Sequence, residues 1–148
     1  MTMHNKKVLL VVSEDWYFCS HRLHLGASLV KAGAEVAVVT KVGRCQEVIQ
    51  RAGIRVIPLN FARSGHNPFR DFMTVCRLVQ IYRREKPDII HHVALKPSLY
   101  GAIAAWITRM PAVVNALGGM GFIFISEHFF ARLVRKATGQ IFRFLMNR

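Results

Sequence analysis

Side chains that could bind or transfer chemical groups gather in three segments of the sequence, Ser13–Ser20, His91–Ser98 and Asn115–Phe122. Carboxylates can act as bases or hold hydroxyl groups, while histidine and lysine can bind hydroxyls and phosphates. The candidates in and beside the first two segments are Glu14, Asp15, Trp16, His21, His91, His92 and Lys96. Each type also has a structural alternative: a solvated acidic pair, a capping histidine or a solvated loop lysine.

The third segment is rich in glycine. Asn115 precedes Gly118, Gly119 and Gly121, so three of four consecutive positions lack a side chain. Such a backbone can approach a ligand closely, and its amides can cradle an anion. A tight connecting turn explains the same pattern, and both interpretations stay open.

Several familiar sites are not expected. Neither G-x-G-x-x-G after the first apolar run nor G-x-x-x-x-G-K-[ST] occurs, which argues against ordinary dinucleotide and P-loop sites. His21 and His24, and the adjacent His91 and His92, have no carboxylate or cysteine at ligand spacing, so no metal site is predicted. Neighbouring residues of a strand point to opposite faces; one of His91 and His92 should therefore face the core and the other the ligand.

The elements that must position these side chains alternate along the chain. Short, β-branched apolar runs predict strands at Lys6–Ser13, Glu35–Thr40, Ile54–Leu59, Asp88–Val93 and Ala112–Ala116. Helices are predicted at Ser20–Ala32, Gly43–Ala52, Phe69–Lys86 and Pro97–Arg109. In the long third helix, Phe72, Leu78 and Tyr82 are expected on the side that packs on the sheet.

Alternating strands and helices predict a doubly wound parallel α/β sheet. With the common strand order 3-2-1-4-5, the loops after strands one, four and five meet where ligands bind in such sheets. The candidate residues of all three segments would then line one cleft.

The last segment, 126–148, is predicted to be a separate basic amphipathic helix after a domain at 1–125. Phenylalanines such as Phe129 and Phe144 share one face, and the opposite face carries Arg132, Arg135, Lys136 and Arg143. The apolar face can pack on the domain, or the helix can lie in an anionic membrane interface. The basic residues are the candidates for contact with lipid headgroups.

Composition limits the class of protein. The chain has 148 residues, 52% of them hydrophobic, and a formal net charge of +13, which favours an anionic partner such as lipid, nucleic acid or a phosphorylated molecule. Three scattered cysteines and a short N-terminal apolar run predict a cytoplasmic chain without disulfides or a signal peptide.

Four stretches together carry a family resemblance: VVSEDWYFCSHRLHLGASLVKAGAEVAVVT, GIRVIPLNFARSGHNP, PDIIHHVALKPSLYGAIAA and VVNALGGMGFIF. Their order and spacing resemble the N-terminal domain of family 4 glycosyltransferases, especially bacterial enzymes that extend lipid-linked glycans in surface-polysaccharide assembly. The resemblance covers nearly the whole chain.

The resemblance implies a Rossmann-like domain that forms the acceptor-binding half of a two-domain GT-B enzyme. Such enzymes transfer sugars with retention of configuration and generally need no metal or other cofactor, the nucleotide sugar being a co-substrate. By position, Asp15, Trp16, His21, Arg22, His92 and Lys96 would bind the acceptor, while Asn115, Gly118, Gly119 and Gly121 would form a loop facing phosphate or donor. No single residue is assigned a catalytic role.

The resemblance also implies a donor-binding half, which these residues do not include. The chain alone is therefore expected to be inactive, as a truncated reading frame, an engineered fragment or one subunit of a split transferase. Its expected partners are a lipid-diphosphate-linked glycan at the inner face of the membrane, the anionic membrane surface and, for a split enzyme, a donor-domain chain. The alternatives are a non-enzymatic basic module that binds nucleic acid or membrane, and a small-molecule enzyme that uses Asp15 and His92 as acid and base.

Overall fold

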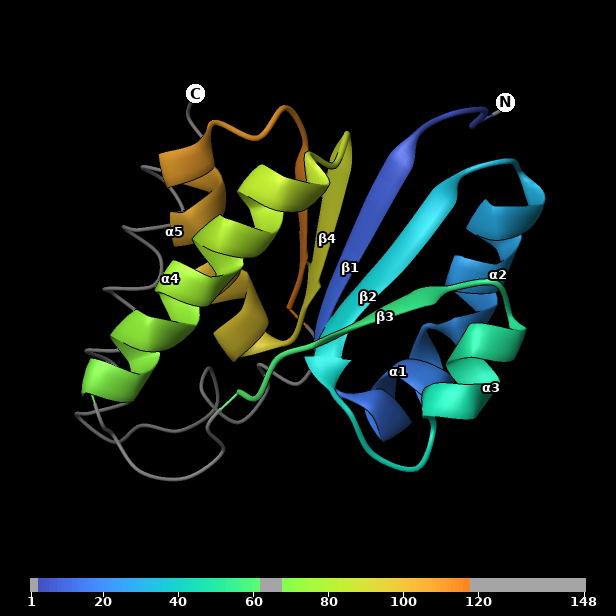
Figure 1. The fold of residues 1–148 in the computed structure, drawn as a ribbon, viewed down its shortest axis with the longest axis horizontal. Coiled ribbons are helices and arrows are strands. Elements are labelled where there is room, and N and C mark those ends of the chain that lie inside the picture. The colour runs from blue at the N-terminus through green and yellow to red at the C-terminus, as the bar shows by residue number, and fades with distance from the viewer. Residues whose placement is uncertain (1–2, 62–67, 118–148) are drawn as a thin grey trace.

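The computed structural model describes residues 3–61 and 68–117. In these residues, helices cover both faces of a parallel sheet (Figure 1). The elements, in chain order, are β1 (Lys7–Glu14), α1 (Asp15–His21), α2 (Leu23–Lys31), β2 (Glu35–Lys41), α3 (Gln46–Arg51), β3 (Arg55–Pro58), α4 (Pro68–Glu85), β4 (Ile89–Val93), α5 (Leu95–Thr108) and β5 (Val113–Ala116). The predicted α/β class is confirmed.

The sheet has five strands in the order β3-β2-β1-β4-β5, which confirms the predicted order. All four pairings are parallel, and Leu10 in the middle of β1 lies between Val38 of β2 and His91 of β4. Strand β1 is buried on both faces from Val8 to Val12, as its continuous apolar run predicts. Strand order reverses between β1 and β4, so ligands are expected beside the carboxyl ends of these strands.

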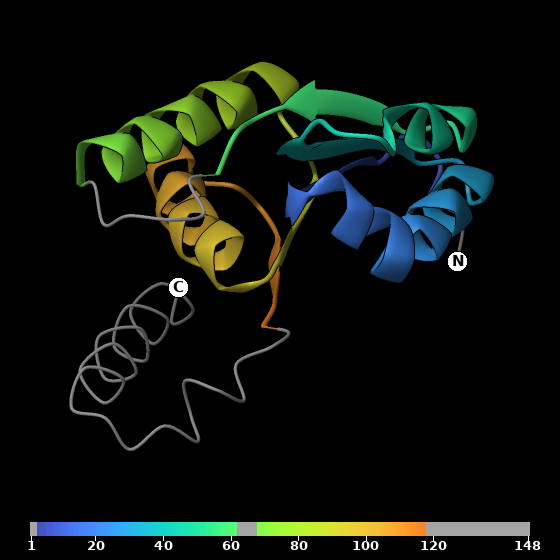
Figure 2. The same ribbon diagram turned by 90° about the horizontal axis from the view of Figure 1, so that it is seen from below.

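Two hydrophobic clusters hold the helices to the sheet. Figure 2 shows α4 and α5 on one side of the sheet and α1 to α3 on the other. On one face, Leu9 and Val11 pack with Leu78 and Tyr82 of α4 and with alanines of α5. On the other face, Leu10 and its neighbours pack with Phe18 of α1 and residues of α2 and α3. The alternation of side chains along β1 therefore divides the core into two layers.

The region after β1 differs from the prediction. Residues 15–20, expected as a loop, form helix α1, and the chain breaks its helical path at Arg22 before α2 begins at Leu23. The predicted single helix from Ser20 is wrong at this point. Aromatic residues and cysteine are middling helix formers, so propensity did not signal this short helix, which the burial of Phe18 stabilises instead.

Helix α4 also differs in one respect. Leu78 and Tyr82 are buried against the sheet as predicted, but Phe72 is 63% exposed and lies on the outer face. Phe69 and Met73, in the same first turns, are exposed as well. The beginning of α4 therefore presents an apolar surface to solvent.

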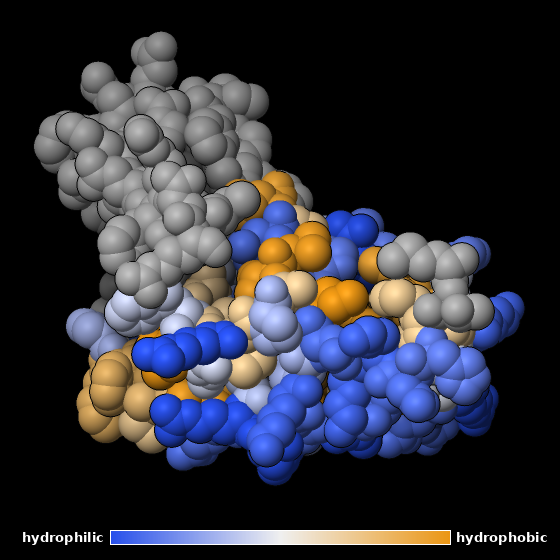
Figure 3. All heavy atoms as spheres, turned by 90° about the horizontal axis from the view of Figure 1, so that it is seen from above, coloured by the Kyte–Doolittle hydropathy of each residue, from blue (hydrophilic) through white to orange (hydrophobic). Residues whose placement is uncertain are grey.

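The amino ends of the strands form a charged edge that is well paired. Lys6 contacts Asp88 at 3.0 Å, and Arg55 contacts both Glu35 and Glu85, at 3.3 and 2.6 Å. The Lys6–Asp88 and Arg55–Glu35 pairs are largely exposed and add little stability, whereas the Glu85 side chain is only 12% exposed. Figure 3, which views the molecule from this side, shows hydrophilic residues over much of the surface outside the grey atoms.

We expect Leu10→Ala to lower the free energy of unfolding by about 2–5 kcal/mol, because it leaves a cavity in a fully buried part of the sheet. Leu25→Ala on α2, where the side chain is 36% exposed, removes the same atoms from the surface and should cost much less. Urea unfolding followed by circular dichroism measures both. Equal losses would contradict the two-layer core.

Candidate functional site

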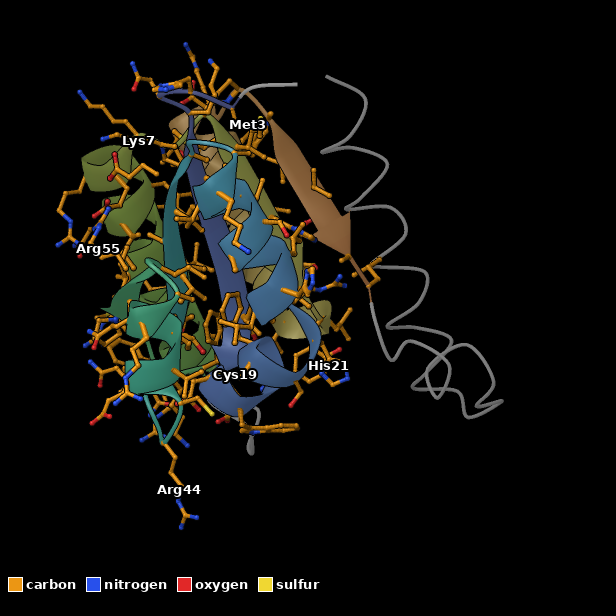
Figure 4. The ribbon with its side chains drawn as sticks, turned by 90° about the vertical axis from the view of Figure 1, so that its right-hand side faces the viewer. Met3, Lys7, Cys19, His21, Arg44 and Arg55 are labelled. Carbon is orange, nitrogen blue, oxygen red and sulfur yellow. The ribbon has the colours of Figure 1, made fainter. Side chains whose placement is uncertain are left out.

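The candidate site lies at the carboxyl edge, by which we mean the ends of β1, β4 and β5 together with the starts of α1 and α5. Because β1, β4 and β5 are consecutive in the sheet, the first and second predicted segments and Asn115 come together there. Figure 4 shows Cys19 and His21 at this end of the domain and Met3 and Lys7 at the opposite end.

Asp15 is a structural anchor at this edge. Asp15 is only 3% exposed. Its carboxylate oxygen Oδ2 accepts hydrogen bonds from the backbone N–H groups of Gly43 and Cys45, at 2.7 and 2.9 Å. A Cβ atom at position 43 would lie 2.8 Å from Asp15 Oδ1, so glycine permits this approach. The predicted ligand-binding carboxylate instead ties α1 to the loop after β2.

Helix α1 presents an aromatic surface. Trp16 is 48% exposed and meets Tyr17 edge to face, with ring centroids 5.8 Å apart. The ring of Tyr17 stacks on His21 at 4.3 Å, and His21 Nδ1 lies 3.2 Å from the carbonyl oxygen of Tyr17. The predicted residues Trp16 and His21 are therefore accessible on one short helix.

Arg22 lies close enough to His91 to affect its charge. Burial and, secondarily, the Arg22 guanidinium lower the pKa of His91, which favours the neutral imidazole. Arg22 Nε and His91 Nε2 are buried atoms that have no hydrogen-bond partner among residues 3–61 and 68–117. The sequence indicated that one histidine of the pair would face a ligand, and His91 is the one with an unused ring nitrogen.

His92 lies in the core, on the other face of the sheet. It is 0% exposed, and its Nε2 and Nδ1 atoms lie 2.7 Å from the Tyr82 hydroxyl oxygen and from Asn115 Oδ1, respectively. Both ring nitrogens are therefore used inside the protein, so His92 does not line the carboxyl edge as a direct ligand. Side chains from α4 decide which of the adjacent histidines is enclosed, and the local sequence does not contain that information.

Helix α5 begins at the carboxyl edge without a side-chain cap or an acidic residue in its first turn. Lys96 lies in that turn, and the Ser98 hydroxyl is fully buried with no hydrogen-bond partner within the described part of the chain. Ala94, the residue before the helix, has φ 75°, a conformation that is costly for a residue with a side chain. Uncapped helix N-termini attract anions, so phosphate is a suitable ligand here.

The two ends of the sheet contrast in how their polar groups are satisfied. At the amino edge the charged groups form ion pairs, whereas the buried, unpartnered atoms Arg22 Nε, Thr40 Oγ1 and Ser98 Oγ lie around the carboxyl edge. A buried polar group without a partner costs free energy, which makes such groups candidates for binding a ligand or water. Ser98 ends the second predicted segment but was not a candidate residue, and Thr40 was not predicted; the sequence has no signal that would single out either hydroxyl.

Some predicted residues lie outside the described residues: Gly118, Gly119, Gly121, Arg132, Arg135, Lys136 and Arg143. The described part contains no group of three histidine, cysteine or acidic residues that could hold a metal ion. A groove of about 380 Å³ between β3 and α4 is lined by Arg77 and Arg84 among others and includes none of the predicted residues. The carboxyl edge is thus defined by its polar groups.

Comparison with known sequences assigns the family. A family profile described as "Glycosyl transferase 4-like" matches residues 7–148, which is nearly the whole chain. The chain belongs to this family. This family agrees with the resemblance to family 4 glycosyltransferases that the four sequence stretches carry. The alternative, a non-enzymatic binding module, receives no support.

Two curated relatives of this glycosyl transferase 4-like chain act on undecaprenol-linked substrates, according to their names. N,N'-diacetylbacillosaminyl-diphospho-undecaprenol alpha-1,3-N-acetylgalactosaminyltransferase of Campylobacter jejuni is 26% identical over 109 residues, 74% of this chain and 29% of that enzyme. The N-acetylglucosamine transferase of Wigglesworthia glossinidia brevipalpis that acts on N-acetylmuramyl-(pentapeptide) pyrophosphoryl-undecaprenol is 24% identical over 63% of this chain and 28% of that enzyme. The chain therefore spans less than a third of the length of either relative.

A solved structure agrees with the fold. A UDP-N-acetylglucosamine 2-epimerase matches 93% of this chain and 40% of its own, with a TM-score of 0.64 and 21% identity. An epimerase and transferases share this type of domain, so the fold alone does not identify the reaction; the site and the family are the evidence for it.

The buried His92 predicts how stability depends on pH. Burial lowers its pKa to about 4, whereas an unfolded histidine has a pKa of about 6.5. The unfolded chain therefore binds more protons between these values, and the free energy of unfolding falls as the pH drops below about 6.5, by up to about 1.4 kcal/mol per pH unit for one histidine. His92→Gln should remove this part of the pH dependence.

Urea unfolding at pH 7 and pH 5 measures this effect. His24→Gln changes an exposed histidine on α2 and serves as the matched control, which should keep the dependence of the unmodified protein. If His92→Gln lost as much stability as the unmodified protein on acidification, the assignment of a neutral, buried His92 would be refuted.

Proposed function

We propose that this chain is the acceptor-binding half of a retaining glycosyltransferase that transfers a sugar from a nucleotide sugar to a lipid-diphosphate-linked glycan. The observation that carries the proposal is the carboxyl edge, where the uncapped start of α5, Lys96 and the unpartnered Ser98 hydroxyl lie together. These groups suit a diphosphate. The names of both curated relatives include an undecaprenol linked through a diphosphate or pyrophosphate.

The proposal gives the residues different roles. Lys96 and the first turn of α5 bind phosphate oxygens, because a positive charge and the positive end of a helix act together there. The exposed rings of Trp16 and His21 and the nearby Arg22 contact the sugar part of the acceptor. Asp15 acts indirectly, by holding α1 in place.

The donor belongs to another part of the enzyme in this proposal. The chain matches 29% of the length of its Campylobacter jejuni relative, so most of such an enzyme lies beyond the matched region. We infer that a second domain or a partner chain binds most of the nucleotide sugar, and that the loop of Asn115, Gly118, Gly119 and Gly121 faces the phosphates or the donor. No cofactor besides the nucleotide-sugar co-substrate is proposed.

Binding of farnesyl diphosphate, a short lipid diphosphate, tests the acceptor role. Lys96→Met should raise its dissociation constant by roughly tenfold, the effect of losing one hydrogen bond to a charged group. Lys31→Met, at the end of α2, makes the same chemical change away from the carboxyl edge and should leave binding unchanged. Isothermal titration calorimetry measures both, with farnesol as the ligand without phosphates.

The proposal fails if farnesyl diphosphate does not bind, or if farnesol binds equally well. It also fails in its assignment of the phosphate site if the two lysine variants have the same affinity.

We further propose that the chain works at the inner, cytoplasmic face of the membrane as a peripheral protein. None of the helices in the described ranges is long and apolar enough to cross a bilayer. The exposed Phe69, Phe72 and Met73 begin α4 at the same end of the sheet as the candidate site, and the formal charge of +13 suits anionic lipids. The basic helix predicted at 126–148 would add to this contact.

Sedimentation with phosphatidylglycerol vesicles tests this location. Binding should weaken as salt is added, and should fall by more than tenfold when Arg132, Arg135 and Lys136 are changed to glutamate, because each basic residue near such a surface contributes about 1 kcal/mol. Phe69→Ser combined with Phe72→Ser should also weaken binding, whereas Val48→Ser, an exposed position on α3, should not. Vesicle binding that none of these changes affects would contradict the proposed membrane contact.

A further inference from the structure

Three side chains from different elements form a hydrogen-bonded chain that ends at the carboxyl edge. Tyr82 of α4, His92 of β4 and Asn115 of β5 are joined by two contacts of 2.7 Å. Tyr82 and His92 are both 0% exposed, whereas Asn115 is partly exposed. A Cβ atom at Gly101 of α5 would collide with the imidazole of His92, so glycine at this position makes room for the ring.

The buried phenol determines which ring nitrogen carries the proton. Burial lowers the pKa of His92 to about 4, so the imidazole is neutral at neutral pH and has one N–H. The Tyr82 hydroxyl hydrogen needs an acceptor because the group is fully buried, and His92 Nε2 is the acceptor that the structure provides. His92 Nε2 is then unprotonated, and Nδ1 carries the proton.

The tautomer in turn fixes the amide of Asn115. His92 Nδ1–H donates to Asn115 Oδ1, so the carbonyl oxygen of this side chain points inward. The amide is planar and its NH₂ group diverges from the oxygen. Within the described residues Asn115 Nδ2 has no hydrogen-bond partner, and Asn115 is partly exposed, so we expect its NH₂ group to be accessible to a ligand.

This surface is the proposed phosphate site. Asn115 pairs in register with His92 of β4, and the next residue, Ala116, accepts a hydrogen bond from Ala94 N–H at 3.0 Å. Ala94 directly precedes α5, whose first turn contains Lys96. The outward amide is therefore close to the start of α5 in the fold.

We propose that Asn115 binds the ligand by donating a hydrogen bond from Nδ2 to a phosphate oxygen, and that Tyr82 and His92 are positioning residues that hold the amide in this orientation. The identity of the ligand as a diphosphate rests on the proposed function. The orientation of the amide does not, because it follows from the hydrogen bonds inside the domain. Without the Tyr82 hydroxyl, His92 would lose its preference for the Nδ1–H tautomer and Asn115 could present either end of its amide.

The tautomer can be measured without any ligand. Two-bond ¹H–¹⁵N correlations of the His92 ring at pH 7 should show Nδ1 protonated and Nε2 unprotonated, and Tyr82→Phe should change this pattern. Tyr100→Phe removes a different phenol, on α5, and should not change it. A protonated Nε2 in the unmodified protein would overturn the positioning role.

Titration with inorganic diphosphate tests the contact. The side-chain NH₂ signal of Asn115 should shift on addition of diphosphate, and Asn115→Asp should raise the dissociation constant by about tenfold or more. Asn60→Asp, an exposed position after β3, introduces the same charge and should have a much smaller effect. Tyr82→Phe should weaken binding severalfold, while Tyr100→Phe should not.

The outcomes separate this proposal from the proposed function. If diphosphate binds and depends on Lys96, but the Asn115 signal does not move and Asn115→Asp behaves as Asn60→Asp, the role of Asn115 is overturned while the acceptor function stands. If diphosphate and farnesyl diphosphate both fail to bind, the acceptor function and the phosphate contact fall together. The ring-nitrogen measurement then decides the positioning role by itself.

Discussion

The central position of strand β1 is the constraint on which the rest of this domain depends. Strand β1 pairs with β2 on one side and β4 on the other, so it must be buried on both faces. Helices α1 to α3 then cover one face and α4 and α5 the other. The reversal of strand order beside β1 leaves the starts of α1 and α5 next to each other at the carboxyl ends, which is where doubly wound sheets bind ligands.

The sequence predicted this framework well because its signals are local. Continuous apolar runs marked the strands, and Gly33 and Gly53, with φ of 89° and 78°, mark the predicted ends of two helices. Helix α1 was missed because its stability comes from burying Phe18 and from the contacts of Asp15, not from the propensities of its residues. The exposed Phe72 was misplaced because the apolar pattern of α4 continues beyond the face that meets the sheet.

The site was predicted less completely, for a reason that His91 and His92 illustrate. Side chains alternate along a strand, so His91 and His92 point to opposite faces of the sheet. Only the helices packed on each face decide which of the two side chains is enclosed. Tyr82, ten residues earlier, and Asn115, twenty-three residues later, enclose His92 and use both of its ring nitrogens. Arg22 lies near His91 in the fold and far from it in the chain. Such long-range partners have no signature in a short motif, so residue types located the site while their individual roles required the folded structure.

The carboxylate of Asp15 has a mechanical consequence for the surface of α1. Its Oδ2 atom accepts hydrogen bonds from the backbone N–H groups of both Gly43 and Cys45. One carboxylate therefore links the loop between β2 and α3 to the first turn of α1. Any side chain at position 43 would press on that carboxylate and shift the first turn that carries Trp16. The loop after β2 can thus shift the neighbouring aromatic rings of α1 without being part of the candidate site, and under the proposed function such a shift would change how these rings contact a sugar.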